Sequence, residues 1–229
     1  MFARKVAVLQ RVITSYRVPI FQELSDSHDF DFCFFYGEDL KSKSKIKSSK
    51  NLGGLPSKKH KTLFFNIFGF SLVLHIGILR SLLEYKPEVI ICEGESNLLS
   101  YLKAIFYKQF FNDVSLIHWS LGSIPGTNKP NLLKILLKKY LLSFFDRFLV
   151  YSSYGKKKLI EYYSINENSI CVAVNISDVD SHLLLSRSTS FEQINLYPKL
   201  SKFFVDKDCF YIITSGFLSK EKDFDKILY

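Results

Sequence analysis

Short runs of apolar residues recur along the chain, and most are continuous rather than alternating with polar residues. They are rich in β-branched and aromatic side chains, which favours strands, and continuous runs are typical of strands buried on both faces of a parallel sheet. The expected strands are Lys5–Leu9, Asp31–Tyr36, Thr62–Ile67, Glu88–Cys92, Val114–His118, Arg147–Ser152, Ile170–Val174 and Cys209–Thr214.

Longer segments between these runs carry apolar residues at helical spacing. A helix is expected from Pro19, because proline suits the first helical position, and another from Ser96, a typical N-cap. Two more are expected from Pro130 and from near Ser153. Strands that alternate with helices predict an α/β fold, with a Rossmann-like parallel sheet flanked by helices.

The most hydrophobic stretch is Leu63–Leu83, but Asn66, His75 and Arg80 interrupt it and Gly69 breaks it. A membrane-spanning helix needs about 20 predominantly apolar residues with few polar ones. Membrane insertion is therefore the alternative here, and a buried strand followed by a helix is the prediction.

Composition and charge narrow the class of protein. The chain has 229 residues, 47% of them hydrophobic, so it can fill a large core, and its net charge of +9 favours an anionic partner. Nucleic acid is not expected, because the sequence has no helix-turn-helix, RNA-binding sheet motif or zinc finger. Four cysteines lie far apart without a CxxC pair, which predicts buried reduced thiols and no metal site.

Two features concentrate the positive charge. The segment Lys41–Lys61 has eight lysines, five serines and no acid, and is expected to be a loop. It is either a solvated surface loop or a basic arm that contacts an anionic membrane or a phosphorylated ligand. The helix from Asn131 carries Lys134, Lys138 and Lys139. It either docks on the sheet with its lysines outward or lies on a membrane.

Candidate chemistry lies after the strands, because ligands of open α/β sheets bind beyond the carboxyl ends of the strands. The loop Gln10–Pro19 lacks a GxGxxG pattern but contains Arg11 and Arg17, which either hold a phosphate near the next helix or pair with carboxylates. Glu93 and Glu95 either bind hydroxyls or act as a base, or they cap the following helix.

A third candidate loop, His118–Gly126, begins at the carboxyl end of its strand. It places His118 and Trp119 before a glycine-rich turn that includes Gly122, which predicts a pocket wall. The alternative for His118 is a core histidine. The sequence contains no GxSxG, HExxH or Walker motif, so it lacks these hydrolase, metalloprotease and nucleotide-binding patterns.

Several segments in this order resemble the family 4 (group 1) glycosyltransferases of the GT-B fold, in particular bacterial enzymes that build surface polysaccharides. The run from Phe145 to Asp180 resembles the family most, because it passes from a strand through a serine and a helix to an N-x-x-D turn at Asn175 and Asp178. The other segments are SYRVPIFQEL, KPEVIICEGESNLLSYL, IHWSLGSIPG and IITSGFLSKEKDFDKIL.

The resemblance implies two Rossmann-like domains that face a cleft. Residues 1–180 would form the acceptor-binding domain, residues 181–205 a linker with an interdomain helix, and residues 206–229 the truncated start of the donor-binding domain. The family's E-x7-E element, which grips the donor sugar, would belong to the missing part, so we expect the chain by itself to be an inactive fragment.

The resemblance also implies roles for individual residues, with His118 as the candidate catalytic residue. Phe217 stands where the family commonly has an arginine, which makes the donor-phosphate site weaker or differently arranged. The residues implied in acceptor binding are Tyr16, Arg17, Glu93, Glu95, His118, Trp119 and Gly122, and those implied in donor-phosphate binding are Arg11, Gly216 and Lys222.

The function implied is transfer of a hexose from a nucleotide sugar to a lipid-linked glycan, with no metal and no cofactor. The protein would be cytoplasmic or peripheral at the inner face of the plasma membrane, with Lys41–Lys61 as its membrane contact. The alternative is a non-catalytic basic module that docks on an anionic membrane or on a partner chain that supplies the donor domain.

Overall fold

The computed structural model describes residues 3–37, 49–67, 70–94, 98–122 and 132–173. The chain divides into two compact units, Met1–Ser177 and Asp178–Tyr229, and every described residue belongs to the first. The expected strand Cys209–Thr214 and the predicted domains 181–205 and 206–229 lie outside the described residues.

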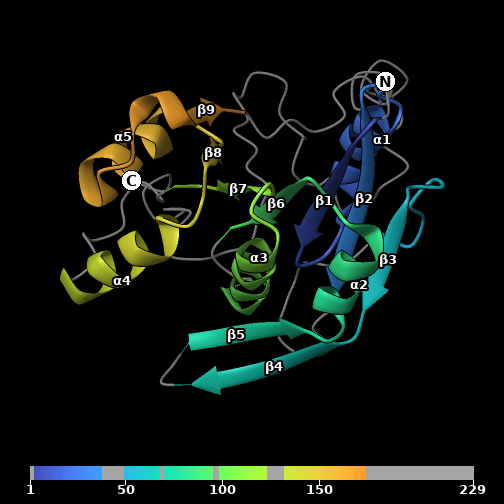
Figure 1. Cartoon of the computed structure of the whole chain (residues 1–229), viewed down its shortest axis with the longest axis horizontal. Coiled ribbons are helices and arrows are strands. Elements are labelled where there is room, and N and C mark those ends of the chain that lie inside the picture. The colour runs from blue at the N-terminus through green and yellow to red at the C-terminus, as the bar shows by residue number, and fades with distance from the viewer. Residues whose placement is uncertain (1–2, 38–48, 68–69, 95–97, 123–131, 174–229) are drawn as a thin grey trace, which may run out of the picture. The chain divides into compact units, whose positions relative to one another are not determined.

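Strands and helices alternate along most of the described chain (Figure 1). The strands are β1 (Arg4–Gln10), β2 (Phe30–Gly37), β3 (Ser57–His60), β4 (Thr62–Ile67), β5 (Phe70–His75), β6 (Val89–Glu93), β7 (Ser115–Ser120), β8 (Arg147–Val150) and β9 (Ile170–Val172). The helices are α1 (Val18–Ser25), α2 (Ile78–Tyr85), α3 (Leu98–Phe110), α4 (Leu132–Leu142) and α5 (Ser153–Tyr163), with the 3-10 turns η1 (Ser15–Arg17) and η3 (Glu167–Ser169).

Seven strands form one sheet in the order β3-β2-β1-β6-β7-β8-β9. Every neighbouring pair is parallel, and in the centre Val8 of β1 pairs with Phe34 on one side and Ile91 on the other. The predicted α/β, Rossmann-like parallel sheet is therefore confirmed. The strand order reverses at β1. From β1 the chain passes outward to β2 and β3, and it then returns to the other side of β1, where β6 is followed outward by β7, β8 and β9.

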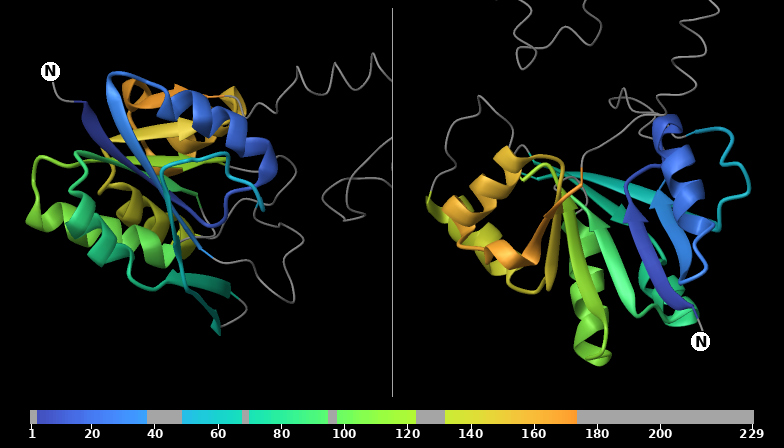
Figure 2. Two further views of the ribbon diagram at one scale, coloured as in Figure 1. Left: turned by 90° about the vertical axis from the view of Figure 1, so that its right-hand side faces the viewer. Right: turned by 90° about the horizontal axis from the view of Figure 1, so that it is seen from above.

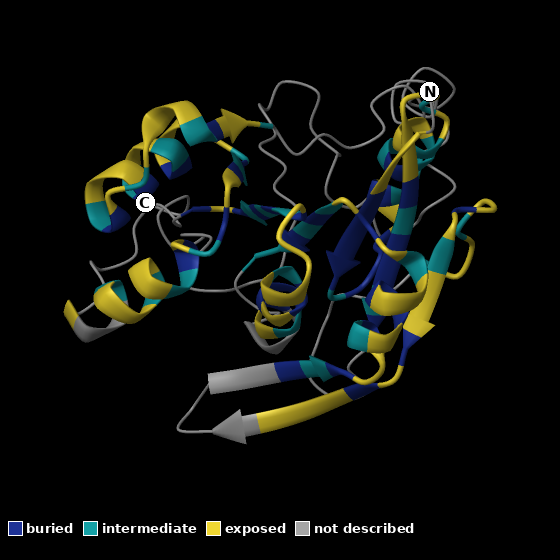
Figure 3. Ribbon diagram, in the orientation of Figure 1, coloured by how far each residue is buried: buried dark blue, intermediate teal, exposed yellow. Residues whose placement is uncertain are grey.

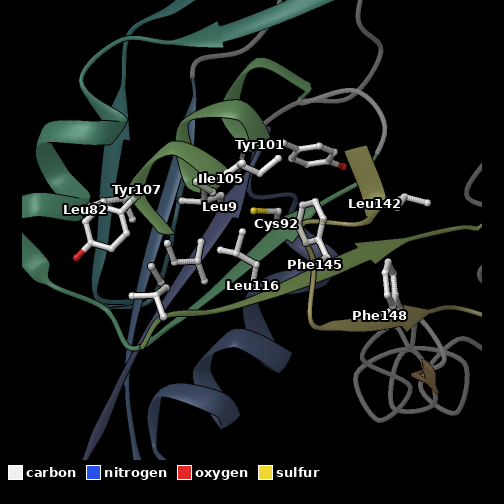
Figure 4. Packing of buried hydrophobic residues seen from close by; sticks show 14 of the residues in the cluster. Leu9, Leu82, Cys92, Tyr101, Ile105, Tyr107, Leu116, Leu142, Phe145 and Phe148 are labelled. Atoms are coloured by element: carbon white, nitrogen blue, oxygen red, sulfur yellow. The ribbon is translucent and has the colours of Figure 1, made fainter. Parts of the chain in front are cut away.

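The two faces of the sheet are covered unequally (Figure 2). On one face, Leu9 of β1 and Leu116 of β7 join a large core with residues of α2, α3, α4 and α5 (Figure 4). On the other face, Val8 and Phe34 pack against Phe21 of α1 in a smaller core. Within the described residues, α1 is the only helix that covers this second face.

Two of the predicted helix starts fall on described residues and are confirmed, while Ser96 and Pro130 lie outside the described residues. Pro19 lies in the first turn of α1. α5 begins after Ser152, whose side chain accepts a hydrogen bond from the backbone N–H of Gly155 at 3.1 Å. This capping bond satisfies an amide that has no partner within its own helix.

Within the hydrophobic stretch Leu63–Leu83, the strand expected at Thr62–Ile67 is largely exposed (Figure 3), whereas β5 after it contains the buried Val73 and His75. β4 and β5 form a separate antiparallel pair, in which Thr62 lies opposite His75, and α2 follows as expected. Leu63, Phe64 and Phe65 are between 36% and 40% exposed, so β4 is a half-exposed ribbon strand rather than a member of the parallel sheet. None of the helices within the described ranges is both long enough and apolar enough to cross a membrane.

The predicted loop Lys41–Lys61 and the predicted buried cysteines also need correction. The last part of the loop forms β3, which pairs with β2 at the edge of the sheet, while residues 41–48 lie outside the described ranges. Cys92 is buried and Cys33 is half-buried, but Cys171 is exposed on the last strand of the sheet. Burial raises the pKa of the Cys33 thiol to about 11, so this thiol stays protonated at neutral pH.

Candidate ligand-binding site at the carboxyl edge of the sheet

The carboxyl ends of β1, β6, β7 and β8 meet at one edge, because these strands are parallel neighbours. β1 ends with Gln10, β6 ends with Glu93, and Tyr151 follows β8 directly. A polar residue at the end of a buried apolar strand is well placed to contact a ligand beyond that edge.

Arg17 joins these strand ends. It is the last residue of η1, the turn that follows the loop after β1, and only 7% of it is exposed. Its Nη1 donates to Glu93 Oε1 at 2.6 Å and also to Gln10 Oε1, and its Nη2 donates to Tyr151 Oη at 3.1 Å. The guanidinium therefore ties β1, β6 and the loop after β8 into one polar cluster, defined here as Gln10, Arg17, Glu93 and Tyr151.

Glu93 is held at both carboxylate oxygens. Oε1 binds Arg17, and Oε2 accepts the backbone N–H of Arg11 at 2.7 Å. The side chains of Arg17 and Glu93 are 9% and 18% exposed, so the ion pair is mostly shielded from water. A charged hydrogen bond in such a setting is stronger than a neutral one, and it orients the carboxylate toward the edge of the sheet.

Aromatic rings enclose the guanidinium. Arg17 Cζ lies 5.0 Å from the centre of a Trp119 ring and 5.8 Å from the centre of the Tyr16 ring. The rings of Trp119 and Tyr151 have centres 5.8 Å apart. A guanidinium over an aromatic face is attracted by the electron density of the ring, so these contacts help to hold Arg17 in place.

The charges of this cluster follow from its contacts. Burial is the largest single effect and lowers the pKa of Arg17, but the charge and hydrogen bond of Glu93 and the neighbouring Tyr151 and Tyr16 together outweigh it, so the pKa of Arg17 is raised overall. Burial raises the pKa of Tyr151 to about 12, even though the positive charge of Arg17 acts in the opposite direction. At neutral pH the cluster thus contains a guanidinium cation and an un-ionised phenol.

Several side-chain polar atoms around the cluster make no hydrogen bond to another described residue. Within the described ranges, Gln10 Nε2, Thr14 Oγ1, Arg17 Nε and Trp119 Nε1 are buried and have no hydrogen-bond partner. Three of these atoms, all except Thr14 Oγ1, are nitrogen donors. Because buried donors in native proteins are rarely left unpaired, the arrangement fits a ligand or water that offers oxygen acceptors.

An apolar cavity of about 260 Å³ adjoins the cluster, on the face of the sheet that α1 covers. Arg17 and Trp119 line it at the cluster. The remaining lining is apolar and consists of Val8, Ile20, Phe21, Leu24, Phe32, Ile91, Leu149 and Ala173. Polar donors beside an apolar wall fit a ligand with both hydroxyl groups and a hydrophobic surface.

The structure places the candidate catalytic residue His118 away from this cluster. Neighbouring residues of a strand point to opposite faces, and His118 lies on the face opposite Trp119. It is 1% exposed and packs among Tyr101, Phe145 and Phe148. Burial, aided by the charge of Lys138, lowers the pKa of His118 to about 3, so this imidazole is neutral.

The other predicted site residues are divided among different places. Arg11 contributes its backbone N–H to the cluster, while its positive charge adds to the effect of burial, the largest cause, in lowering the pKa of His75 at the end of β5. Gly122 contacts the start of α5 rather than the cluster. Glu95, Gly216 and Lys222 lie outside the described residues.

Two members of the cluster, Gln10 and Tyr151, were absent from the predicted site. Gln10 is fully buried at the end of β1, and Tyr151 comes directly after β8. The rule that pointed to Glu93 applies to both of them, since each is a polar residue at the carboxyl end of a strand. Tyr151 falls within the expected strand Arg147–Ser152, since aromatic residues favour strands.

A backbone contact fixes the loop after β7 against α5. Gly122 has φ of 73°, and a Cβ built there would lie 2.8 Å from the carbonyl oxygen of Gly155. We expect Gly122→Ala to lower the free energy of unfolding by about 3 kcal/mol, because both the left-handed backbone and the clash oppose a side chain. Gly54→Ala is the control, since Gly54 has φ of 80° but open space around it, and about 1 kcal/mol is expected there. Equal losses in urea unfolding of the two variants would contradict the close contact.

A metal site of side chains is not evident in the described part of the chain, where no three His, Cys, Asp or Glu residues are grouped to hold an ion.

Comparison with known proteins gives the fold a context. No family model matches the sequence, and no curated protein matches it. Among solved structures, a glycosyltransferase from Rickettsia africae is similar with a TM-score of 0.54 and 12% identity, over 91% of this chain and 51% of that one. The HepE protein of Anabaena, solved with UDP and glucose, is similar with a TM-score of 0.53 and 12% identity, over 86% of this chain and 50% of that one.

The chain thus spans about half the length of these two proteins. At such low identity the likeness establishes the fold and not the activity. The chain shares the α/β, Rossmann-like architecture of these structures, as its parallel sheet shows directly.

Proposed function

We propose that this chain provides the acceptor-binding half of a glycosyltransferase that uses a nucleotide sugar. The observation that carries the proposal is the polar cluster of Gln10, Arg17, Glu93 and Tyr151 at the carboxyl edge of the sheet. The similarity in fold to a Rickettsia africae glycosyltransferase and to Anabaena HepE in complex with UDP and glucose supports the same class of reaction.

The cluster suits a sugar better than a free phosphate. Glu93 balances the charge of Arg17, so the pair presents hydrogen-bonding groups with little net charge. The unpartnered nitrogens of Gln10, Arg17 and Trp119 are donors for hydroxyl oxygens, and Tyr16 is 41% exposed beside the cluster. Aromatic rings next to hydrogen-bond donors provide an apolar surface and polar contacts together.

In the proposed reaction, a hydroxyl oxygen of the acceptor forms the new glycosidic bond. The bond between the anomeric carbon of the donor and its phosphate oxygen breaks, the nucleoside diphosphate leaves, and the hydroxyl proton is released. Positive groups must stabilise the charge that develops on the leaving group. Gly216 and Lys222 are proposed for this role from the family resemblance, and the nucleotide sugar is a substrate rather than a cofactor.

The acceptor is proposed to be a lipid-linked glycan in surface-polysaccharide synthesis, on the cytoplasmic side of the membrane. Its sugar would occupy the polar cluster. The apolar cavity between α1 and the sheet adjoins the same cluster through Arg17 and Trp119, so it is a candidate position for a less polar part of the acceptor.

Trp119 allows a direct test, because it is the single tryptophan of the chain and lies beside Arg17. Its fluorescence is titrated with short saccharides and with detergent-solubilised lipid-linked saccharides, and release of nucleoside diphosphate from a panel of nucleotide sugars is measured in parallel. Saccharide binding by this chain supports the proposal, with little or no acceptor-dependent release expected because the proposal assigns it only the acceptor-binding half. If no saccharide changes the Trp119 signal, the proposal fails.

The variant Tyr151→Phe tests the role of the cluster. Removing the hydroxyl that holds Arg17 is expected to weaken saccharide binding roughly fivefold, in line with about 1 kcal/mol for a neutral hydrogen bond. Tyr154→Phe is the matched control, because Tyr154 is 39% exposed on α5, and its affinity should equal that of the wild type. Unchanged affinity in Tyr151→Phe would contradict the assignment of the site.

A further inference from the structure

The apolar cavity beside α1 continues directly from the polar cluster on one face of the sheet. Three residues that line the cavity lie two positions before a member of the cluster: Val8 before Gln10, Ile91 before Glu93 and Leu149 before Tyr151. Side chains two residues apart on a strand point to the same face and are separated by about 7 Å along it. A row of polar groups at the carboxyl edge is therefore followed at once by a row of apolar groups.

The two polar side chains that line the cavity carry hydrogen-bond donors and no acceptor. They are Arg17 and Trp119, and the other lining side chains are apolar. A guanidinium and an indole offer only N–H groups. Within the described ranges, Arg17 Nε and Trp119 Nε1 are buried and make no hydrogen bond. An oxygen that reaches either nitrogen removes the cost of an unpaired buried donor.

This lining favours a carbonyl oxygen over a hydroxyl or an anion. A hydroxyl brings a proton that needs an acceptor, whereas a carbonyl oxygen only accepts. An anion is not required, because the charge of Arg17 is balanced by Glu93, whose Oε1 lies 2.6 Å from Arg17 Nη1. The group that suits the polar end of the cavity is therefore a neutral carbonyl.

The rest of the cavity suits an apolar group attached to that carbonyl. The cavity has a volume of about 260 Å³. A cavity of about 150 Å³ is enough for a benzene-sized molecule, so there is room here for an acetyl group or a somewhat longer acyl chain. On a saccharide, the acylamino group of an amino sugar combines a neutral carbonyl with an apolar end.

We propose that the cavity binds the acylamino group of an N-acetylated amino sugar whose ring lies at the polar cluster. This inference rests on the proposed function, because it names the acceptor sugar of the same site. The carbonyl oxygen accepts from Arg17 or Trp119, and the methyl group faces the apolar row that includes Val8 and Ile91. The acceptor thus ends in an N-acetylhexosamine rather than in a plain hexose.

The test compares sugars that differ only in the acylamino group, by titration of Trp119 fluorescence in the 229-residue chain. N-acetylglucosamine and N-acetylgalactosamine are expected to bind at least tenfold more tightly than glucose and galactose. Each of them adds one hydrogen bond and buries one methyl group. Glucosamine, which has the nitrogen but no acyl group, should not show this gain.

The variant Ala173→Phe tests the position of the acyl group, because Ala173 lines the cavity. The larger side chain takes up this space and should reduce the preference for N-acetylglucosamine over glucose to less than threefold. Val172→Phe is the matched control. The N–H of Ala173 donates to the carbonyl oxygen of Val150 at 2.8 Å, which continues the pairing of β9, so Val172 points to the opposite face and its variant should keep the preference. Circular dichroism checks that both variants are folded.

Three results would overturn the proposal. One is equal affinity for N-acetylglucosamine and glucose, which would leave the proposed function standing and remove only this role of the cavity. Another is the full wild-type preference in Ala173→Phe. The third is a larger gain from a hexyl chain at C1 of glucose than from the N-acetyl group, which would make an alkyl chain the occupant. If no saccharide changes the fluorescence, the proposed function fails as well.

Discussion

Replacing Glu93 with glutamine is expected to lower the free energy of unfolding by about 3 kcal/mol, the low end of the range for breaking a buried ion pair. Glu93 neutralises Arg17, whose side chain is only 9% exposed, and the two atoms of the bond lie 2.6 Å apart. With a neutral amide at this position, the guanidinium stays buried without a counter-charge. Its remaining bonds to Gln10 and Tyr151 are to uncharged groups and do not replace the lost attraction.

A double-mutant cycle separates the pair from its surroundings. Arg17→Met removes the cation, and the double variant Arg17→Met/Glu93→Gln should cost clearly less than the sum of the two single changes, because neither charge is then left alone. Urea unfolding followed by circular dichroism provides the energies. The matched control is Glu88→Gln, which breaks the ion pair between Glu88 and Arg4. The side chain of Arg4 is 63% exposed and that of Glu88 is 52% exposed. A change below about 1 kcal/mol is expected for this control.

Two outcomes would contradict this account of the cluster. If Glu93→Gln is as stable as the wild type, the Arg17–Glu93 pair is not shielded as the structure has it. If the two single changes add without coupling, the two side chains do not depend on each other.

Acidification from pH 7.5 to pH 5 is expected to destabilise the protein by about 4 kcal/mol through two buried histidines. Burial, aided by the charge of Lys138, lowers the pKa of His118 to about 3. Burial, aided by the charges of His60, Lys103 and Arg11, lowers the pKa of His75 to about 4.

The direction follows from proton binding. In the unfolded chain both histidines take up a proton below about pH 6.5, while in the folded protein they remain neutral until the pH approaches their lowered pKa values. The unfolded state therefore binds more protons between these limits, and stability falls as the pH falls from about 6.5 toward 4 and 3. Each histidine contributes about 2 kcal/mol of this loss at pH 5.

His118→Phe tests this prediction, because phenylalanine suits a position among Tyr101, Phe145 and Phe148 and cannot be protonated. The difference in unfolding free energy between pH 7.5 and pH 5 should shrink by about 2 kcal/mol in this variant. His28→Gln is the control, since His28 is exposed, and its pH dependence should match the wild type. A His118→Phe variant with the full wild-type pH dependence would show that His118 is not held neutral.

The sequence alone determined the architecture and part of the candidate site. Continuous apolar runs such as Lys5–Leu9 predicted β1 and its parallel neighbours, because a strand buried on both faces has no polar side. Proline and serine signals placed the starts of α1 and α5. The rule that ligands bind beyond strand ends selected Arg17, Glu93 and Trp119, which the structure brings together.

Only the tertiary structure decided which face each side chain occupies and what it contacts. His118 and Trp119 are adjacent in sequence, yet the alternation of β7 sends one into the core and the other toward Arg17. Gln10 and Tyr151 belong to the site because both bind Arg17, from which they are separated by 7 and 134 positions in the sequence. The apolar cavity equally depends on the sheet, because its lining comes from α1 and from strands that are far apart in the sequence.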